Sequence, residues 1–154
     1  MSVREAIRRQ YQGVANQAAS QVLGFRRPQE GWVVTVRKAL GMSGAQLARR
    51  LGVSRASVSQ TEKNERSGNV TIKHMQAIAE ALGCKFVYAI VPEKNIETLI
   101  LNQAQQKATD LVRRTSGHMA LEKQALPNEW NAREAERLRD DLVRAMPSDF
   151  WEER

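Results

Sequence analysis

The chain has little cysteine and no long apolar run. Cys84 is the single cysteine among 154 residues. One thiol excludes an internal disulfide framework and a zinc site built from cysteine pairs. No run approaches the roughly 18 apolar residues that a membrane helix needs, and the opening residues MSVREAIRRQ contain no apolar signal core. We therefore expect a soluble, cytoplasmic protein with no membrane partner.

The sequence also lacks the residue groups that enzymes and metalloproteins use. It has no glycine-rich phosphate loop and no nucleophile paired with a base. Its two histidines, His74 and His118, stand alone, with no second histidine or cysteine at ligand spacing. We expect no enzymatic activity, no cofactor and no bound metal.

Charge is unevenly distributed along the chain. The 24 Lys and Arg outnumber the 17 Asp and Glu, which gives a formal net charge of +7. Residues 31–92 carry nine basic and three acidic groups, whereas residues 127–154 carry five and eight. A basic middle favours a polyanion partner, because clustered Lys and Arg release counterions from phosphate. Solubility alone is the alternative that the charge leaves open.

The spacing of apolar residues predicts a mainly helical chain. They recur every three or four positions over residues 3–23, which indicates an amphipathic helix followed by a linker. Glycines and Ser or Thr caps delimit four short helices, at 31–40, 44–51, 55–64 and 72–82. Further helices are expected over about 96–113, 117–126 and 135–146, with a break at residues 115–117.

Residues 84–91, CKFVYAIV, are rich in β-branched and aromatic residues and end at Pro92. This composition predicts one strand. A lone strand needs a backbone partner, and the same strand of a second copy is the simplest one. We therefore expect a homodimer, and its pairing residues are Cys84, Phe86, Val87, Tyr88 and Ile90. A strand packed beside a loop in a monomer is the alternative.

Residues 43–62, SGAQLARRLGVSRASVSQTE, have the layout of a helix-turn-helix. Gly52 makes the turn between the two helices, and Val58 anchors the second helix to the core. The half of this helix that enters a DNA major groove then carries four outward residues. These candidate base-reading residues are Arg55, Ala56, Ser59 and Gln60. An unrelated helical hairpin is the alternative interpretation.

Residues 31–83 resemble the five-helix Cro/C1-type (XRE family) domain of phage repressors and bacterial regulators. The stretch RASVSQTEKNERSGNVTIKHMQAIAEALGCKFVYAIVP is similar, within that group, to the mobile mystery protein A family. Genes of that family sit beside a Fic-domain partner in a toxin–antitoxin-like arrangement. The resemblance implies a lambda-repressor-like helix-turn-helix domain with one C-terminal strand and flanking helices. It also implies a transcription regulator that represses its own mobile-element operon, with an antitoxin-like role. A protein-binding antitoxin that neutralises a Fic-type toxin, with DNA binding secondary, is the alternative.

The resemblance also implies roles for single residues. Arg55 and Gln60 occupy base-reading positions, where Arg suits guanine and Gln suits adenine. Ala56 and Ser59 share that face. The residues placed at the DNA backbone are Ser43, Gly44, Ser57, Lys63 and Arg37.

Two further positions are informative in this comparison. Arg37 and Glu62 match a pair that forms a structural salt bridge in the family. Thr61 departs from the family pattern, because an apolar residue is more usual there.

The predicted organisation has three parts: residues 1–30 as a helix and linker, residues 31–92 as the DNA-binding domain with its dimerising strand, and residues 93–154 as a helical extension. Two-fold symmetry predicts a pseudo-palindromic operator in double-stranded DNA. Trp130, Phe150 and Trp151 stand in an acidic tail, and aromatic anchors in polar surroundings are typical of protein interfaces. These three are candidate partner-binding residues. The alternative is that they pack on the chain's own last helix.

Overall fold

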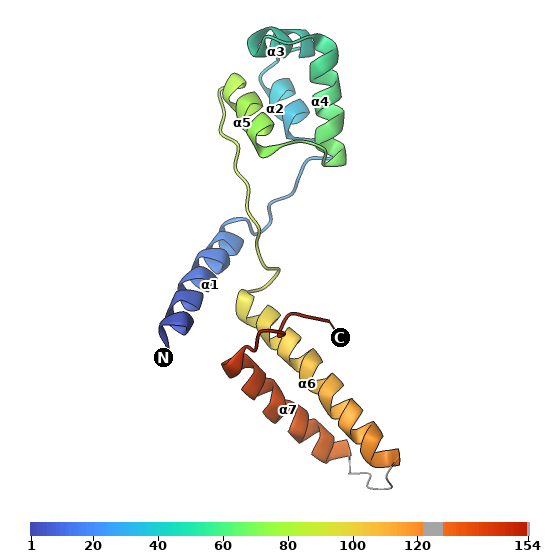
Figure 1. Ribbon diagram of the computed structural model, residues 1–154. Coiled ribbons are helices and arrows are strands. Elements are labelled where there is room, and N and C mark those ends of the chain that lie inside the picture. Colours follow the sequence, from blue (N-terminus) through green and yellow to red (C-terminus); the bar gives the residue numbers. More distant parts are fainter. Residues whose placement is uncertain (122–127, 154) are drawn as a thin grey trace. The chain divides into compact units, whose positions relative to one another are not determined.

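The computed structural model describes residues 1–121 and 128–153, which form two compact units. The central unit is Leu23–Ala89, and the terminal unit joins Met1–Val22 with Ile90–Arg154. The described residues contain seven helices (Figure 1): α1 (Val3–Gln21), α2 (Trp32–Ala39), α3 (Gly44–Leu51), α4 (Arg55–Ser67), α5 (Ile72–Ala81), α6 (Ile96–Leu121) and α7 (Asn128–Ala145). None of the helices in the described part is long and apolar enough to cross a membrane.

Side-chain caps set where the helices of the central unit begin. Ser43 accepts the amide of the third residue of α3, and Ser54 and Thr71 do the same for α4 and α5. Each such cap stabilises its helix by about 1 kcal/mol. α3 ends at Gly52, whose φ of 69° lies in the left-handed region that glycine adopts without strain. The four predicted short helices are thus confirmed, with α4 continuing to Ser67.

One apolar cluster holds the four helices of the central unit together. Its buried members are Val33, Leu47, Ala48, Val58, Met75, Ile78 and Leu82. Leu47 and Ala48 of α3 meet Val58 of α4, and Ile78 and Leu82 add the face of α5 and its C-cap. In Figure 1, α3 lies across one end of α4, so the two helices meet at a steep angle. Val58 therefore anchors α4, as the sequence predicted.

Residues 84–91 do not form the predicted strand. Residues 31–83 contain four helices, α2 to α5, where the resemblance implied five, so both expectations are wrong for this chain. Gly83, with a φ of 71°, turns the chain out of α5, and the Cys84 amide closes that turn on the Ala79 carbonyl at 2.8 Å. The β-branched residues that follow do not favour helix. A strand also needs a ladder partner, and the described residues of a single chain supply none. The central unit is therefore built on four helices.

The terminal unit is centred on a hairpin of α6 and α7, which run antiparallel side by side (Figure 1). Ile100 and Ala104 of α6 pack against the buried ring of Phe150. The predicted break at residues 115–117 is wrong, because α6 continues to Leu121. The Thr115 hydroxyl donates to the Leu111 carbonyl of the same helix at 3.0 Å, so a polar side chain is accommodated without a break. The predicted helix at 117–126 extends over residues 122–127, which lie outside the described residues.

α1 confirms the predicted N-terminal helix. Ser2 and Glu5 form a reciprocal capping box at its start. Asn16 joins α1 to α6: its Oδ1 accepts the Ile96 amide at 2.8 Å, and its Nδ2 donates to Glu97 Oε2 at 2.8 Å. No residue of α1 is buried, and Arg8 of this helix also contacts the Met146 sulfur.

Candidate nucleic-acid interface

α4 has one buried face and one exposed face. Val58 and Glu65 are buried, and Thr61 and Glu62 are half-buried beside them. The exposed residues of the other face include Arg55, Ala56, Ser59, Gln60 and Lys63. At about 100° per residue these five fall within an arc of about 140°. The structure therefore gathers the four candidate base-reading residues on one exposed helix face, together with Lys63.

Ser57 lies outside this arc, although it is exposed. Its amide donates to Ser54 Oγ at 3.1 Å and so belongs to the N-cap of α4. What Ser57 can offer to a phosphate is its hydroxyl group.

A capping box closes the start of α3. The Gln46 amide donates to Ser43 Oγ at 3.1 Å, and the Ser43 amide donates to Gln46 Oε1 at 2.7 Å. The Leu47 amide bonds to the Ser43 carbonyl at 3.1 Å. The amides of Gly44 and Ala45 thus remain at the helix N-terminus, where an anion is favoured.

Arg37 and Glu62 form an ion pair between α2 and α4. Arg37 Nε lies 2.8 Å from Glu62 Oε1, and the two side chains are only 14% and 13% exposed. Arg37 also donates from Nη1 to the Met42 carbonyl at 3.1 Å. The Arg37 guanidinium is bound on two sides and is largely covered. Arg37 therefore holds α4 in place, and little of its guanidinium remains accessible to a phosphate.

Two contacts of α4 were not predicted. The carboxylate of Glu65 accepts the amides of Trp32 at 2.5 Å and Val33 at 3.0 Å, so it caps the start of α2. Thr61 Oγ1 lies 3.2 Å from His74 Nε2 and links α4 to α5. The sequence signal for the second contact was a polar residue on an inward face, since such a residue needs a partner.

The comparisons with known proteins bear on the central unit. Residues 35–88 match the helix-turn-helix family model. The match covers about a third of the chain, from α2 to the segment after α5. No curated protein and no solved structure matches the chain.

The helix-turn-helix match identifies a broader group of proteins than the family resemblance of the sequence does. It supports an XRE-type domain and gives no support to the mobile mystery protein A family, to an antitoxin role or to a Fic-domain partner.

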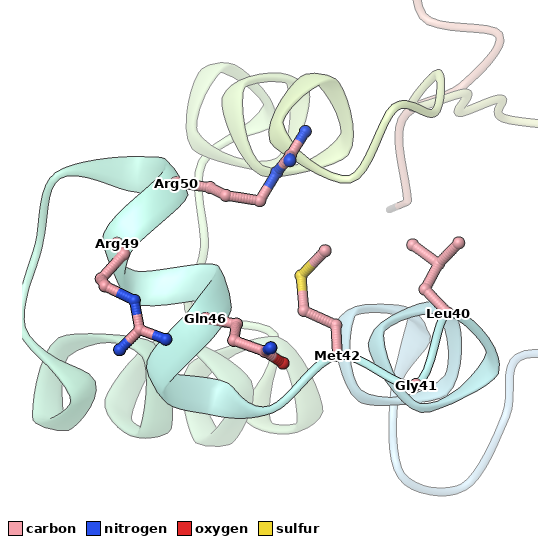
Figure 2. Close-up of a pocket in the computed structure, with 6 residues that line it drawn as sticks. All are labelled: Leu40, Gly41, Met42, Gln46, Arg49 and Arg50. Atoms are coloured by element: carbon pink, nitrogen blue, oxygen red, sulfur yellow. The ribbon is translucent and has the colours of Figure 1, made fainter.

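The two arginines of α3, Arg49 and Arg50, point in different directions. Figure 2 shows Arg50 extending toward α5, where its Nε donates to the Ala81 carbonyl at 2.7 Å. Arg49 extends in a different direction from the same helix (Figure 2). Both line an open hollow of about 470 Å³ beside Met42 and Gln46. Arg50 thus ties α3 to α5, and none of the candidate base-reading residues lines this hollow.

The segment after α5 keeps the exposed apolar residues that were expected at a dimer interface. Val87 and Tyr88 are about two-thirds exposed, and Ile90 is 97% exposed. Phe86 instead packs partly against the core of the helix-turn-helix region, and Cys84 is exposed.

The three tail aromatics do not form one binding surface. Phe150 is 1% exposed and is held in the core of the terminal unit, so it is not available to a partner. Trp151 is 58% exposed and meets Phe150 edge to face. Trp130 is exposed and lies near the opposite end of α6 from Phe150. Gln103, in the first half of α6, bonds to Phe150, whereas Ser116, near the C-terminal end of α6, bonds to Asn131, the neighbour of Trp130. Phe150 thus follows the alternative of packing within the chain.

Proposed function

We propose that this protein is a sequence-specific DNA-binding transcriptional regulator that represses its own operon. The observation that carries the proposal is the exposed first half of α4, where Arg55, Ala56, Ser59 and Gln60 share one face of a helix fixed by its other face. The helix-turn-helix match over residues 35–88 supports the same function. An exposed helix face of this kind, largely polar, suits insertion into a major groove.

In the proposed complex, the face of α4 reads base edges. Arg55 donates two hydrogen bonds to guanine O6 and N7, and Gln60 pairs with adenine. Ala56 suits the methyl group of thymine, and Ser59 serves either kind of base. Each bidentate pair discriminates against the wrong base by about 1–3 kcal/mol.

The proposed complex also has contacts to the DNA backbone, which position the protein on the duplex and do not distinguish one base from another. They come from Lys63, from the hydroxyl of Ser57 and from the start of α3 at Ser43 and Gly44. Arg37 supports them indirectly, through its ion pair with Glu62.

A homodimer is part of the proposal. The exposed apolar residues Val87, Tyr88 and Ile90 lie in a segment that forms neither helix nor strand within the chain, and such a segment can pair with its copy across a two-fold axis. Residues 31–92 then form the DNA-binding and dimerising domain, flanked by residues 1–30 and 93–154. The dimer binds a pseudo-palindromic operator with half-sites one helical turn, or a multiple of it, apart.

The proposal is tested by titrating the wild type and Arg55→Ala with double-stranded DNA from the gene's own upstream region, at two salt concentrations. We expect specific wild-type binding that weakens steeply with salt. Arg55→Ala should lose about tenfold or more in affinity for the specific site.

Arg49→Ala is the matched control, because it removes an exposed positive charge of the same unit from outside α4. It should weaken binding slightly and equally for every DNA sequence. Equal, weak and salt-sensitive binding by the wild type and Arg55→Ala would sink the proposal.

Binding of a partner protein is the second candidate function. The observation that favours it is the exposed apolar stripe of α1, with Val3, Ile7, Tyr11 and Val14 at helical spacing. A Fic-domain toxin is the partner that the resemblance implies, and the protein would then be its antitoxin. Co-purification with a Fic-domain protein encoded beside this gene, lost in Tyr11→Asp and kept in Gln17→Asp on the same helix, is the result expected for that function.

A further inference from the structure

Gln60 and Asn64 are joined on α4, one helical turn apart. Gln60 Nε2 donates to Asn64 Oδ1 at 2.8 Å. Gln60 is exposed, and Asn64 is half-buried at the flank of the proposed base-reading face. The amide that meets the DNA is therefore already held by a neighbour in the free protein.

This hydrogen bond restricts what the Gln60 amide can offer to a base. A free glutamine side chain has two N–H donors on Nε2 and an acceptor at Oε1, and it can turn either end toward a partner. With one Nε2 hydrogen given to Asn64, the second hydrogen and Oε1 remain. One donor beside one acceptor is the pattern that complements adenine, which presents an acceptor at N7 and a donor at N6.

The same restriction works against guanine. Guanine presents two acceptors in the major groove, N7 and O6. A free glutamine can turn both Nε2 hydrogens toward these two atoms. When Asn64 holds one hydrogen, Oε1 faces a guanine acceptor instead, and two acceptors repel each other.

We propose that Asn64 is a specificity-determining positioning residue, which orients the Gln60 amide so that it accepts adenine and rejects guanine. This inference rests on the proposed function, because it requires that α4 reads DNA. Asn64 acts through Gln60 and need not touch the base itself.

The test measures binding to a set of operators in which each base pair is varied in turn. The base pair read by Gln60 is the one at which Gln60→Ala loses discrimination. At that pair we expect the wild type to prefer A·T over G·C by roughly tenfold or more, and Asn64→Ala to reduce the preference to within about threefold. Alanine favours helix, so this variant keeps α4 folded.

Asn64→Asp is the matched control, because it keeps an acceptor oxygen for Gln60 Nε2. Its added negative charge weakens binding to all sequences by a similar factor, while the preference for A·T over G·C is kept. In the Gln60→Ala background, Asn64→Ala should cause no further change in discrimination, since the group it orients is absent.

Two negative outcomes separate the inference from the function on which it rests. If the wild type binds all sequences equally, the proposed function fails and takes the inference with it. If the wild type is selective but Asn64→Ala keeps the full A·T preference at the Gln60 pair, the inference alone is overturned. It is also overturned if Asn64→Ala changes discrimination at other pairs to the same extent.

Discussion

The carboxylate of Glu65 lies directly against the backbone of Gly31. A β-carbon placed on Gly31 would be 2.8 Å from Glu65 Oε2, and Gly31 has a φ of 90°. The absence of a side chain at Gly31 lets the carboxylate reach the amides of Trp32 and Val33 at the start of α2. A residue of α4 thus supplies the N-cap that α2 does not have in its own sequence.

Replacing Glu65 should destabilise the central unit strongly. Glu65→Ala leaves two amides at the start of α2 without their acceptor, and we expect a loss of about 2–4 kcal/mol in the free energy of unfolding. Urea denaturation followed by circular dichroism measures the loss. Glu80→Ala, an exposed glutamate of α5, is the control and should cost under about 0.5 kcal/mol. A loss for Glu65→Ala as small as that of the control would contradict the capping role.

Gly31→Ala tests the same contact from the other side. The new methyl group meets the carboxylate, and the positive φ strains any residue with a β-carbon. We expect a destabilisation of about 1–3 kcal/mol in the same denaturation experiment. Gly13→Ala, where a β-carbon meets nothing within 4 Å, should be neutral or stabilising.

The ion pair of Arg37 and Glu62 should contribute more than a surface pair does. Both side chains are largely covered, and Arg37 is held further by the Met42 carbonyl. A double-mutant cycle with Arg37→Met and Glu62→Gln should give a coupling energy of about 1–2 kcal/mol. The exposed pair of Lys38 and Glu30 provides the comparison, with an expected coupling below about 0.5 kcal/mol. Equal couplings for the two pairs would show that burial adds nothing to the first.

Local features of the central unit could be predicted because neighbouring residues determine them. Ser43, Ser54 and Thr71 cap helices within three residues of themselves, and the outward face of α4 follows from helical spacing around Val58. The helix boundaries of this unit depend on such short-range chemistry. They were therefore correct to within a few residues.

Long-range contacts could not be predicted from spacing. The bond between Glu65 and Val33 joins residues 32 positions apart, and the bond between Asn16 and Glu97 joins residues 81 apart. The strand prediction for residues 84–91 failed for a related reason, because β-propensity describes a residue that already has a ladder partner. Phe150 shows the same limit, since an aromatic residue in an acidic tail suits a partner's surface and the chain's own core equally well.

Phe150 should be a main source of stability for the terminal unit. It is buried between α6 and α7 against Ile100 and Ala104. Phe150→Ala should cost about 3–5 kcal/mol, since it removes a large buried ring and leaves a cavity. Trp151→Ala, at an exposed position beside it, should cost much less. Thermal unfolding of the full chain measures both losses of stability. If Trp151→Ala cost as much as Phe150→Ala, the special contribution of the buried Phe150 ring would be contradicted.

The attachment of α1 to α6 should depend on pH through Glu97. Its own backbone amide, and then the Asn16 side chain, hold the pKa of Glu97 below its usual value. A carboxylate with a lowered pKa stabilises the folded form above the pKa of the unfolded chain, and the contribution is lost as pH falls through the folded value. The contact between α1 and α6 should therefore be complete at neutral pH and weaken in acid. The Asn16 side-chain amide signal in NMR should follow the Glu97 titration, and Glu97→Gln should abolish that response.

Asn16→Ala should release α1 from α6 at every pH, because it removes both hydrogen bonds that Asn16 makes to Ile96 and Glu97. No residue of α1 is buried, so little apolar packing replaces them. Hydrogen exchange at neutral pH should then be faster in α1 than in the wild type and unchanged in α7. Gln17→Ala, an exposed neighbour, should leave exchange in α1 as it is. If Asn16→Ala also left it unchanged, other contacts, such as that of Arg8 with the Met146 sulfur, would be holding α1 in place, and acid would not loosen it.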